Sequence, residues 1–158
     1  MDDLPFETPI LLRSHHGTDL VNPIGMEIAR SRTTTNQGRL ESMVLRKLDN
    51  GDVAIQCFRN QCFLEVDASG NCRFAAVSTL DEKHKFSVET HALSGSENHL
   101  FFVSRHVGKV LQSKSSGDVR CENYNRLTWE AWTILEPLAV LERNMNEQLK
   151  VNAKLNSV

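Results

Sequence analysis

The feature that most constrains the fold of this chain is an internal repeat in three copies. Residues 13–20 align with residues 104–111, which matches Gly17 to Gly108, and residues 58–64 supply the middle copy. Each copy ends in a matching segment, and these closing segments are residues 43–45, 86–88 and 132–134. Corresponding positions lie about 45 residues apart, as expected when one supersecondary unit is repeated along a chain.

The pattern within each copy predicts short strands separated by turns. Turn signals such as Asp49-Asn50-Gly51 and Ser94-Gly95-Ser96 alternate with β-branched and aromatic stretches. Glycine permits positive φ in such turns, and Asn or Asp hydrogen-bonds its own backbone. Many short strands with turns between them predict a sandwich or a barrel. A propeller blade has a similar period, but a propeller closes only with about four or more blades.

Three four-stranded units around one interior predict an all-β fold, a β-trefoil with a C-terminal α-helix. We expect an N-terminal tail at residues 1–8, the trefoil at 9–136 and the helix at 137–158, with repeats at about 9–50, 51–96 and 97–136. Apolar residues of all three copies should share one interior. The predicted interior residues are Leu12, Leu20, Ile28, Met43, Leu45, Val53, Ile55, Leu64, Phe74, Phe86, Val88, Val103, Leu111, Trp132 and Ile134.

Composition and motifs favour a non-enzymatic cytoplasmic protein. The net charge of −2 gives no overall basic field for nucleic acid, and no apolar run approaches the roughly 20 residues of a membrane span. The first residues are acidic and lack the order of a secretory signal. The four cysteines form no CxxC pair, and no phosphate loop, HExxH or GxSxG motif occurs. We therefore expect no catalytic residue, no metal and no cofactor.

The third copy carries three short motifs: Gly-Lys-Val-Leu at residues 108–111, Gly-Asp-Val-Arg at 117–120 and Trp-Glu-Ala-Trp at 129–132. In this order they resemble a fascin repeat, which has a G-K-Y-L strand, then G-x-V-x, then a closing W-E-x-F. The likeness extends over roughly residues 9 to 136. The chain is similar in the same way to the related actin-cross-linking-like domains and to the hisactophilins. The second copy departs from it, with Lys83 where the third has Trp129 and Gln61 where the others have glycine.

The resemblance implies a trefoil with a binding or scaffolding role, and actin as a candidate partner. It carries over no individual residue, because the fascins share no short actin-binding motif. A carbohydrate-binding lectin is the alternative, although the closing strands lack the repeated Gln-x-Trp of the ricin-type branch. A trefoil that binds a protease or a receptor through one long loop is a third alternative. The fold alone does not distinguish these three functions.

Four residues are candidates for a pH-sensitive partner site. His15, Arg59 and His106 occupy matching positions in the three copies, and His16 lies beside the first. Threefold symmetry would place all four residues at one end of the barrel. Because histidine changes its charge near physiological pH, partner binding at such a cluster would depend on pH. The alternative is that all four are ordinary solvated turn residues.

A basic stretch is the second candidate partner site. Between residues 28 and 48 lie Arg30, Arg32, Arg39, Arg46 and Lys47 against Glu41, five positive charges minus one negative, a local +4. Such a loop could bind actin or another acidic protein surface, an anionic lipid or a phosphate. The alternative is a solvated loop neutralised by acidic neighbours.

The C-terminal segment carries an apolar stripe at helical spacing, formed by Leu138, Leu141, Met145 and Leu149. The stripe either docks on the trefoil or pairs two chains into a homodimer. Two tryptophans remain: Trp132 is expected in the core, whereas Trp129 is a possible sugar-stacking residue whose place the spacing leaves open.

Overall fold

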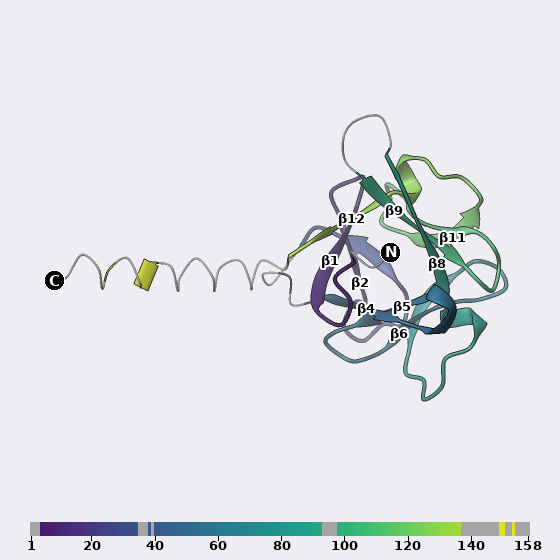
Figure 1. Cartoon of the computed structure of the whole chain (residues 1–158), viewed down its shortest axis with the longest axis horizontal. Coiled ribbons are helices and arrows are strands. Elements are labelled where there is room, and N and C mark those ends of the chain that lie inside the picture. Colours follow the sequence, from purple (N-terminus) through teal and green to yellow (C-terminus); the bar gives the residue numbers. More distant parts are fainter. Residues whose placement is uncertain are drawn as a thin grey trace.

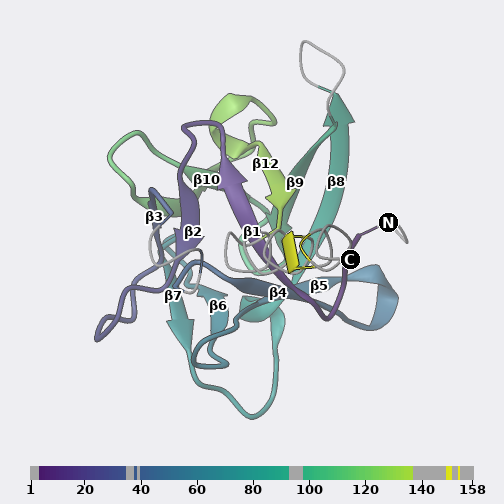
Figure 2. The same ribbon diagram turned by 90° about the vertical axis from the view of Figure 1, so that its left-hand side faces the viewer.

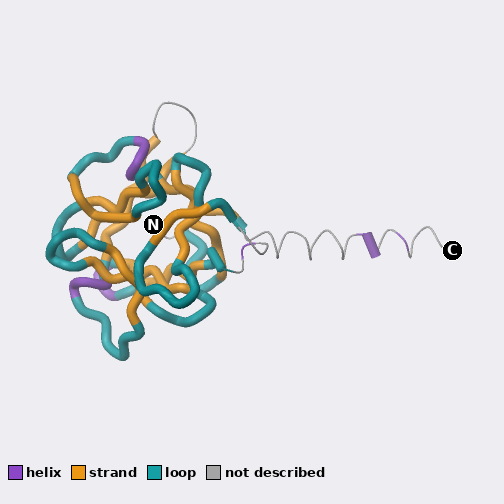
Figure 3. Tube along the Cα trace, turned by 180° about the vertical axis from the view of Figure 1, so that it is seen from behind, coloured by secondary structure: helices purple, strands orange, loops and turns teal. Residues whose placement is uncertain are grey.

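The computed structural model describes residues 4–34, 38, 40–92, 98–136, 149–150 and 153. Short strands and loops make up nearly all of the described body (Figure 3). The strands of repeat 1 are β1 (Pro9–Ser14), β2 (Asp19–Val21), β3 (Arg30–Arg32) and β4 (Met43–Lys47). Those of repeat 2 are β5 (Val53–Cys57), β6 (Phe63–Val66), β7 (Cys72–Ala75) and β8 (Phe86–Ala92). Those of repeat 3 are β9 (Asn98–Ser104), β10 (Val110–Ser113), β11 (Val119–Asn123) and β12 (Trp132–Leu135). Three 3-10 helices are η2 (Asp49–Gly51), η3 (Glu82–His84) and η4 (Thr128–Glu130).

The first and last strands of each repeat form a closed ring. Strand β1 pairs with β12 and β4, β5 pairs with β4 and β8, and β9 pairs with β8 and β12, all antiparallel. The pairing of β1 with β12 brings the two ends of the trefoil side by side (Figures 1 and 2). The ring is therefore completed by strands from opposite ends of the sequence.

The second and third strands of each repeat form three hairpins that cap the ring. Main-chain hydrogen bonds link each pair of repeats across the cap. The three symmetry-related bonds run from Ser31 N to Gly117 O (2.9 Å), from Phe74 N to Glu27 O (2.6 Å) and from Cys121 N to Gly70 O (2.8 Å). The cyclic order of the three links gives the cap an approximate threefold symmetry, as the repeat predicts.

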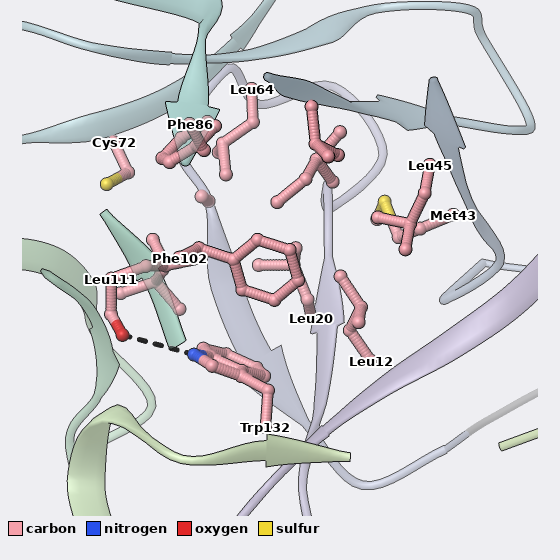
Figure 4. Packing of buried hydrophobic residues seen from close by; sticks show 14 of the residues in the cluster. Leu12, Leu20, Met43, Leu45, Leu64, Cys72, Phe86, Phe102, Leu111 and Trp132 are labelled. Carbon is pink, nitrogen blue, oxygen red and sulfur yellow. Dashed lines mark hydrogen bonds between the residues drawn. The ribbon is translucent and has the colours of Figure 1, made fainter. Parts of the chain in front are cut away.

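The closing strands supply the largest side chains of the core. Met43, Phe86 and Trp132 begin β4, β8 and β12 and are fully buried, which confirms their predicted positions. The Trp132 indole Nε1 donates to the Leu111 carbonyl at 3.1 Å, so its polar atom is satisfied inside the core (Figure 4). Phe86 packs edge-on against Phe102. Each such side chain contributes about 1.5–3 kcal/mol through burial.

The prediction that Ile28 is a core residue is wrong, because Ile28 is 42% exposed. The strand register pairs Leu20 with Ser31, just as it pairs Leu111 with Cys121. Ser31 therefore takes the inward position of repeat 1, and its Oγ lies 2.6 Å from Ser113 Oγ. Three other predicted interior residues, Val88, Val103 and Ile134, are only partly buried.

The predicted N-terminal tail is partly packed against the trefoil. Leu4 and Phe6 pack against the core, and Glu7 N donates to Leu45 O at 3.0 Å. The predicted C-terminal helix lies almost wholly outside the described residues. Of that segment, residues 149, 150 and 153 have helical backbone, and the described part of the chain contains no bounded helix after β12. Within the described residues, no helix is long and apolar enough to cross a membrane.

Candidate binding surfaces at the repeat junctions

Three equivalent junctions surround the ring. At each one, the turn after the first strand of a repeat lies beside the segment that precedes the closing strand of the repeat before it. Phe58 N donates to Ser42 O at 3.0 Å at junction 1/2, and Arg105 N donates to Lys85 O at 2.9 Å at junction 2/3. At junction 3/1 the His16 ring lies 5.6 Å from the Trp129 ring. The pseudo-symmetry thus repeats one surface three times with different side chains.

Junction 3/1 exposes a tryptophan beside two histidines. The Trp129 side chain is 41% exposed and Leu127, two residues earlier, is more so. His16 fixes one edge of the indole, because its own Nε2 lies 3.0 Å from the carbonyl oxygen of Ser113. The exposed His15 ring lies 6.1 Å from that of His16. We call these four residues, His15, His16, Leu127 and Trp129, the Trp129 surface.

The backbone under Trp129 is held by a buried carboxyl group. Leu127 N–H donates to Glu130 Oε1 at 3.1 Å, and Ala131 N donates to Thr128 O at 3.2 Å. Burial raises the pKa of Glu130, although the Leu127 hydrogen bond opposes that shift. Because the turn is fixed at both ends, the indole is presented with little freedom left to lose on binding.

Beside junction 1/2, residues of repeat 1 line a small cavity of about 230 Å³ with mostly apolar walls. Its lining residues are Val21, Pro23, Ile24, Met26, Arg32, Leu40 and Glu41. Leu40 stands three residues before its closing strand, the position that Trp129 holds in repeat 3. The two junctions therefore expose apolar side chains at equivalent places.

Junction 2/3 is polar by contrast. Lys83 occupies the position of Trp129 and is exposed. Behind it, Asp81 N–H donates to Nδ1 of the buried His84 at 3.1 Å, so the proton of the imidazole sits on Nε2, 2.9 Å from Glu65. Burial raises the pKa of Glu65, but hydrogen bonds from Arg73 and His84 outweigh it, and the pKa lies below its ordinary value.

The structure distributes the predicted histidine–arginine site over all three junctions. His15 and His16 lie at junction 3/1, and Arg59 donates to the Asn22 carbonyl at 2.9 Å at junction 1/2. His106 is exposed at junction 2/3, near enough to Asp81 to lower the pKa of that carboxyl group, though the main cause there is the backbone hydrogen bond from Lys83. Among the described residues, no contact joins His15, Arg59 and His106.

The predicted basic stretch is largely engaged by neighbours. Arg30 forms an ion pair with Asp118 and donates to Ser116 O at 3.0 Å. Arg46 pairs with Glu7 at 2.8 Å. Arg32 is exposed, and Arg39 lies outside the described residues.

Of the four residues of the predicted oligomerisation stripe, only Leu149 is among the described residues. Leu138, Leu141 and Met145 lie outside the described residues, and Leu149 is exposed.

All four cysteines are free thiols. The pKa of Cys72 is raised by its contact with Cys121 and by burial, which is the opposite of an activated thiol. In the described part of the chain, no three His, Cys, Asp or Glu residues are placed to hold a metal ion.

Comparison with solved structures identifies the fold. The chain is similar to the GlcNAcα1-4Gal-releasing endo-β-galactosidase from Clostridium perfringens, with a TM-score of 0.68 and 14% identity over 80% of this chain and 32% of that one. It is also similar to ThreeFoil, a designed 3-fold symmetric protein, with a TM-score of 0.65 and 15% identity over 81% of this chain and 98% of that one. This chain therefore spans about a third of the galactosidase. No family model matches it, and neither does any curated protein. The protein has a β-trefoil fold.

Sequence reasoning missed the cavity at junction 1/2. Its signal was present in the turn between β2 and β3, which carries Pro23, Ile24 and Met26. The matching turns, residues 67–71 and 114–118, contain only small, polar or charged residues. An apolar turn among polar equivalents is a usable sign of a binding surface.

Proposed function

We propose that this protein is a non-enzymatic binding protein, of the actin-associated or scaffolding kind implied by its resemblance to the fascins. Its Trp129 surface contacts a partner protein. The observation that supports this most is a fixed, exposed indole at a position where the symmetry-related residues are Leu40 and Lys83. A cytoplasmic location belongs to the same proposal.

The chemistry of the Trp129 surface suits a protein interface. Tryptophan is enriched among the residues that dominate binding energy, and rigid presentation reduces the entropy lost on association. The flanking Leu127 extends the apolar area, and His15 and His16 supply a polar rim. Trp129 also belongs to the third copy, which is the copy with the clearest likeness to a fascin repeat.

Cosedimentation with filamentous actin tests the proposal. The wild type should pellet with actin, and Trp129→Ala should weaken the apparent affinity by roughly tenfold or more. Lys83→Ala is the matched control, because it truncates the equivalent side chain at junction 2/3. Runs at about pH 6 and about pH 7.5 show whether His15 and His16 contribute through their charge. Wild-type protein that stays in the supernatant at both pH values would exclude actin as the partner.

Carbohydrate binding is the second candidate function, and the exposed indole beside an imidazole favours it. Sugar rings present apolar C–H faces that stack on tryptophan, and histidine can bond their hydroxyl groups. A glycan array separates the two functions. Specific glycan signals that are lost in Trp129→Ala but retained in Trp129→Phe would support a lectin, because phenylalanine keeps an aromatic face. An empty array together with actin pelleting would reject it.

A further inference from the structure

We infer that junction 1/2 is a second partner site, which takes an apolar side chain and an adjacent carboxylate from an acidic peptide segment of a partner protein. We call the seven residues around its cavity the Arg32 pocket: Val21, Pro23, Ile24, Met26, Arg32, Leu40 and Glu41. The inference does not depend on what binds the Trp129 surface, because the two sites share no residue.

The apolar walls of the Arg32 pocket are unusual for a surface turn. Ile24 is 66% exposed and Met26 is 48% exposed, and both stand in a turn whose equivalents in repeats 2 and 3 are polar. Neither residue contributes to the buried core. Grouped apolar side chains around a concavity are the usual mark of a binding site.

The turn that carries these side chains is fixed in place. Asn22 Nδ2 donates to Met26 O at 2.8 Å, and Met26 N donates to Pro23 O at 3.1 Å. From repeat 2, Asn60 Nδ2 donates to Asn22 Oδ1 at 2.7 Å and Arg59 donates to Asn22 O at 2.9 Å. The pocket is therefore formed before any ligand arrives, and its binding does not require the turn to be ordered.

Arg32 gives the pocket its charge preference. Among the described arginines, eight have a guanidinium group that forms a hydrogen bond or an ion pair, and the Arg32 guanidinium forms neither: the eight are Arg13, Arg30, Arg46, Arg59, Arg73, Arg105, Arg120 and Arg126. A guanidinium without a partner at the mouth of an apolar cavity is suited to a bidentate carboxylate. Glu41 is buried in the same wall and disfavours an anion deep in the cavity. The ligand carboxylate therefore belongs at the mouth, with the apolar side chain inside.

The position of the pocket has a functional consequence. Leu40 and Trp129 are equivalent by the threefold pseudo-symmetry, so the two sites face outward in different directions around one rigid ring. One domain can then hold two partner segments at once, which scaffolding requires and which a single site could not provide.

The test is a two-dimensional ¹⁵N–¹H NMR titration of the full chain with a defined probe. The probe is the acetylated and amidated peptide Asp-Glu-Leu-Phe, and the matched peptides are Lys-Lys-Leu-Phe and Asp-Glu-Ser-Gly. We expect the first peptide to shift the amide signals of Ile24, Met26 and Arg32, and both matched peptides to bind at least about tenfold more weakly.

Variants separate the parts of the proposal. Arg32→Glu should reverse the preference in favour of the lysine peptide, whereas Lys83→Glu, the same charge change at junction 2/3, should not. Met26→Ser should weaken binding of the first peptide, and Trp129→Ala should leave it unchanged. All four positions are exposed, so circular dichroism should show an intact fold.

Three outcomes would overturn the inference. One is the absence of shifts at the pocket with peptide in millimolar excess. Another is a set of shifts confined to the Trp129 surface, which would assign the peptide to that surface instead. The third is Arg32-dependent binding to phosphatidylserine vesicles with no response to the peptide, which would make the pocket a membrane contact.

Discussion

At the scale of single residues, the cap depends on one glycine more than on the others. Gly70 has a φ of +83°, and a Cβ added there would lie 2.2 Å from the Cys121 carbonyl oxygen. This close approach accompanies the hydrogen bond from Cys121 N to Gly70 O that ties repeat 3 to repeat 2. Gly17 has a similar φ of +78° in the turn after β1, but nothing lies within 4 Å of its added Cβ.

The two glycines therefore give a matched pair of substitutions. Gly17→Ala should cost roughly 1 kcal/mol, the price of a side chain at positive φ. Gly70→Ala should cost about 3 kcal/mol or more, since it adds a clash with backbone that must move. Urea unfolding of both variants measures the difference. Equal losses of stability would show that the close approach at the cap is easily relaxed.

Single residues also show how far sequence reasoning reaches. Trp132 could be predicted as core because its repeat position holds a large apolar residue in every copy. The same reasoning failed for Ile28, because the polar Ser31 occupies the inward position of repeat 1 and hides the true alignment. The exposure of Trp129 and the contact of His16 with it depend on how repeats 3 and 1 meet, and a periodic pattern carries no information on that contact.

At the scale of elements, strand β8 is tied to the loop between β11 and β12 by charge. Arg126 donates to both carboxylate oxygens of Glu89, at 3.1 and 3.0 Å, and His91 lies 3.1 Å from the same group. The hydrogen bonds from Arg126 and then His91 lower the pKa of Glu89 from 4.5 to about 2. A carboxyl group with a depressed pKa in the folded state stabilises the fold above its unfolded pKa.

The stabilisation from Glu89 should disappear in acid. It is complete above about pH 5 and is lost as the pH falls toward the folded pKa of about 2. Arg126→Gln should therefore be less stable than wild type near neutral pH, with a difference that shrinks toward about pH 2. Arg32→Gln removes the same charge without breaking a pair and is the control. Denaturation curves across this pH range measure the free energy of unfolding of each variant. If Arg126→Gln differed from wild type by the same amount at every pH, the stabilisation could not come from the ionised Glu89.

The strands themselves were predictable where all three copies agree. The closing strands begin at Met43, Phe86 and Trp132, as their alignment indicates. The cap strands were harder to align, because the β2–β3 turn, residues 22–29, is three residues longer than its equivalents and carries apolar residues. Local pattern could not show that this turn forms the wall of a cavity, since the opposite wall comes from Leu40 and Glu41.

At the scale of the whole molecule, the ring makes the order of the repeats unimportant for packing. Each repeat contacts both others through the ring and through the cap, and β1 meets β12 as neighbouring strands. A chain that starts at another repeat boundary could form the same contacts.

Circular permutation tests this property. A permutant that joins residue 158 to residue 1 through a short linker and opens between Asn50 and Gly51 should fold, because both residues are exposed in a turn. A second permutant, opened between Ala54 and Ile55, should not fold, because it cuts a buried strand of the ring. Dispersed NMR spectra and cooperative unfolding of the first permutant alone are the expected result. Failure of both permutants would mean that the original chain order is needed.

Closure of the ring also restricts the ways in which anything can attach to this molecule. Each of the six strands of the ring is paired with a neighbour on both sides, so a partner protein cannot bind by adding a strand to the ring. Attachment to the ring must instead use the side chains of the surrounding turns. Exchanging a few of those side chains would then redirect the protein to new targets while the framework beneath them stays as it is.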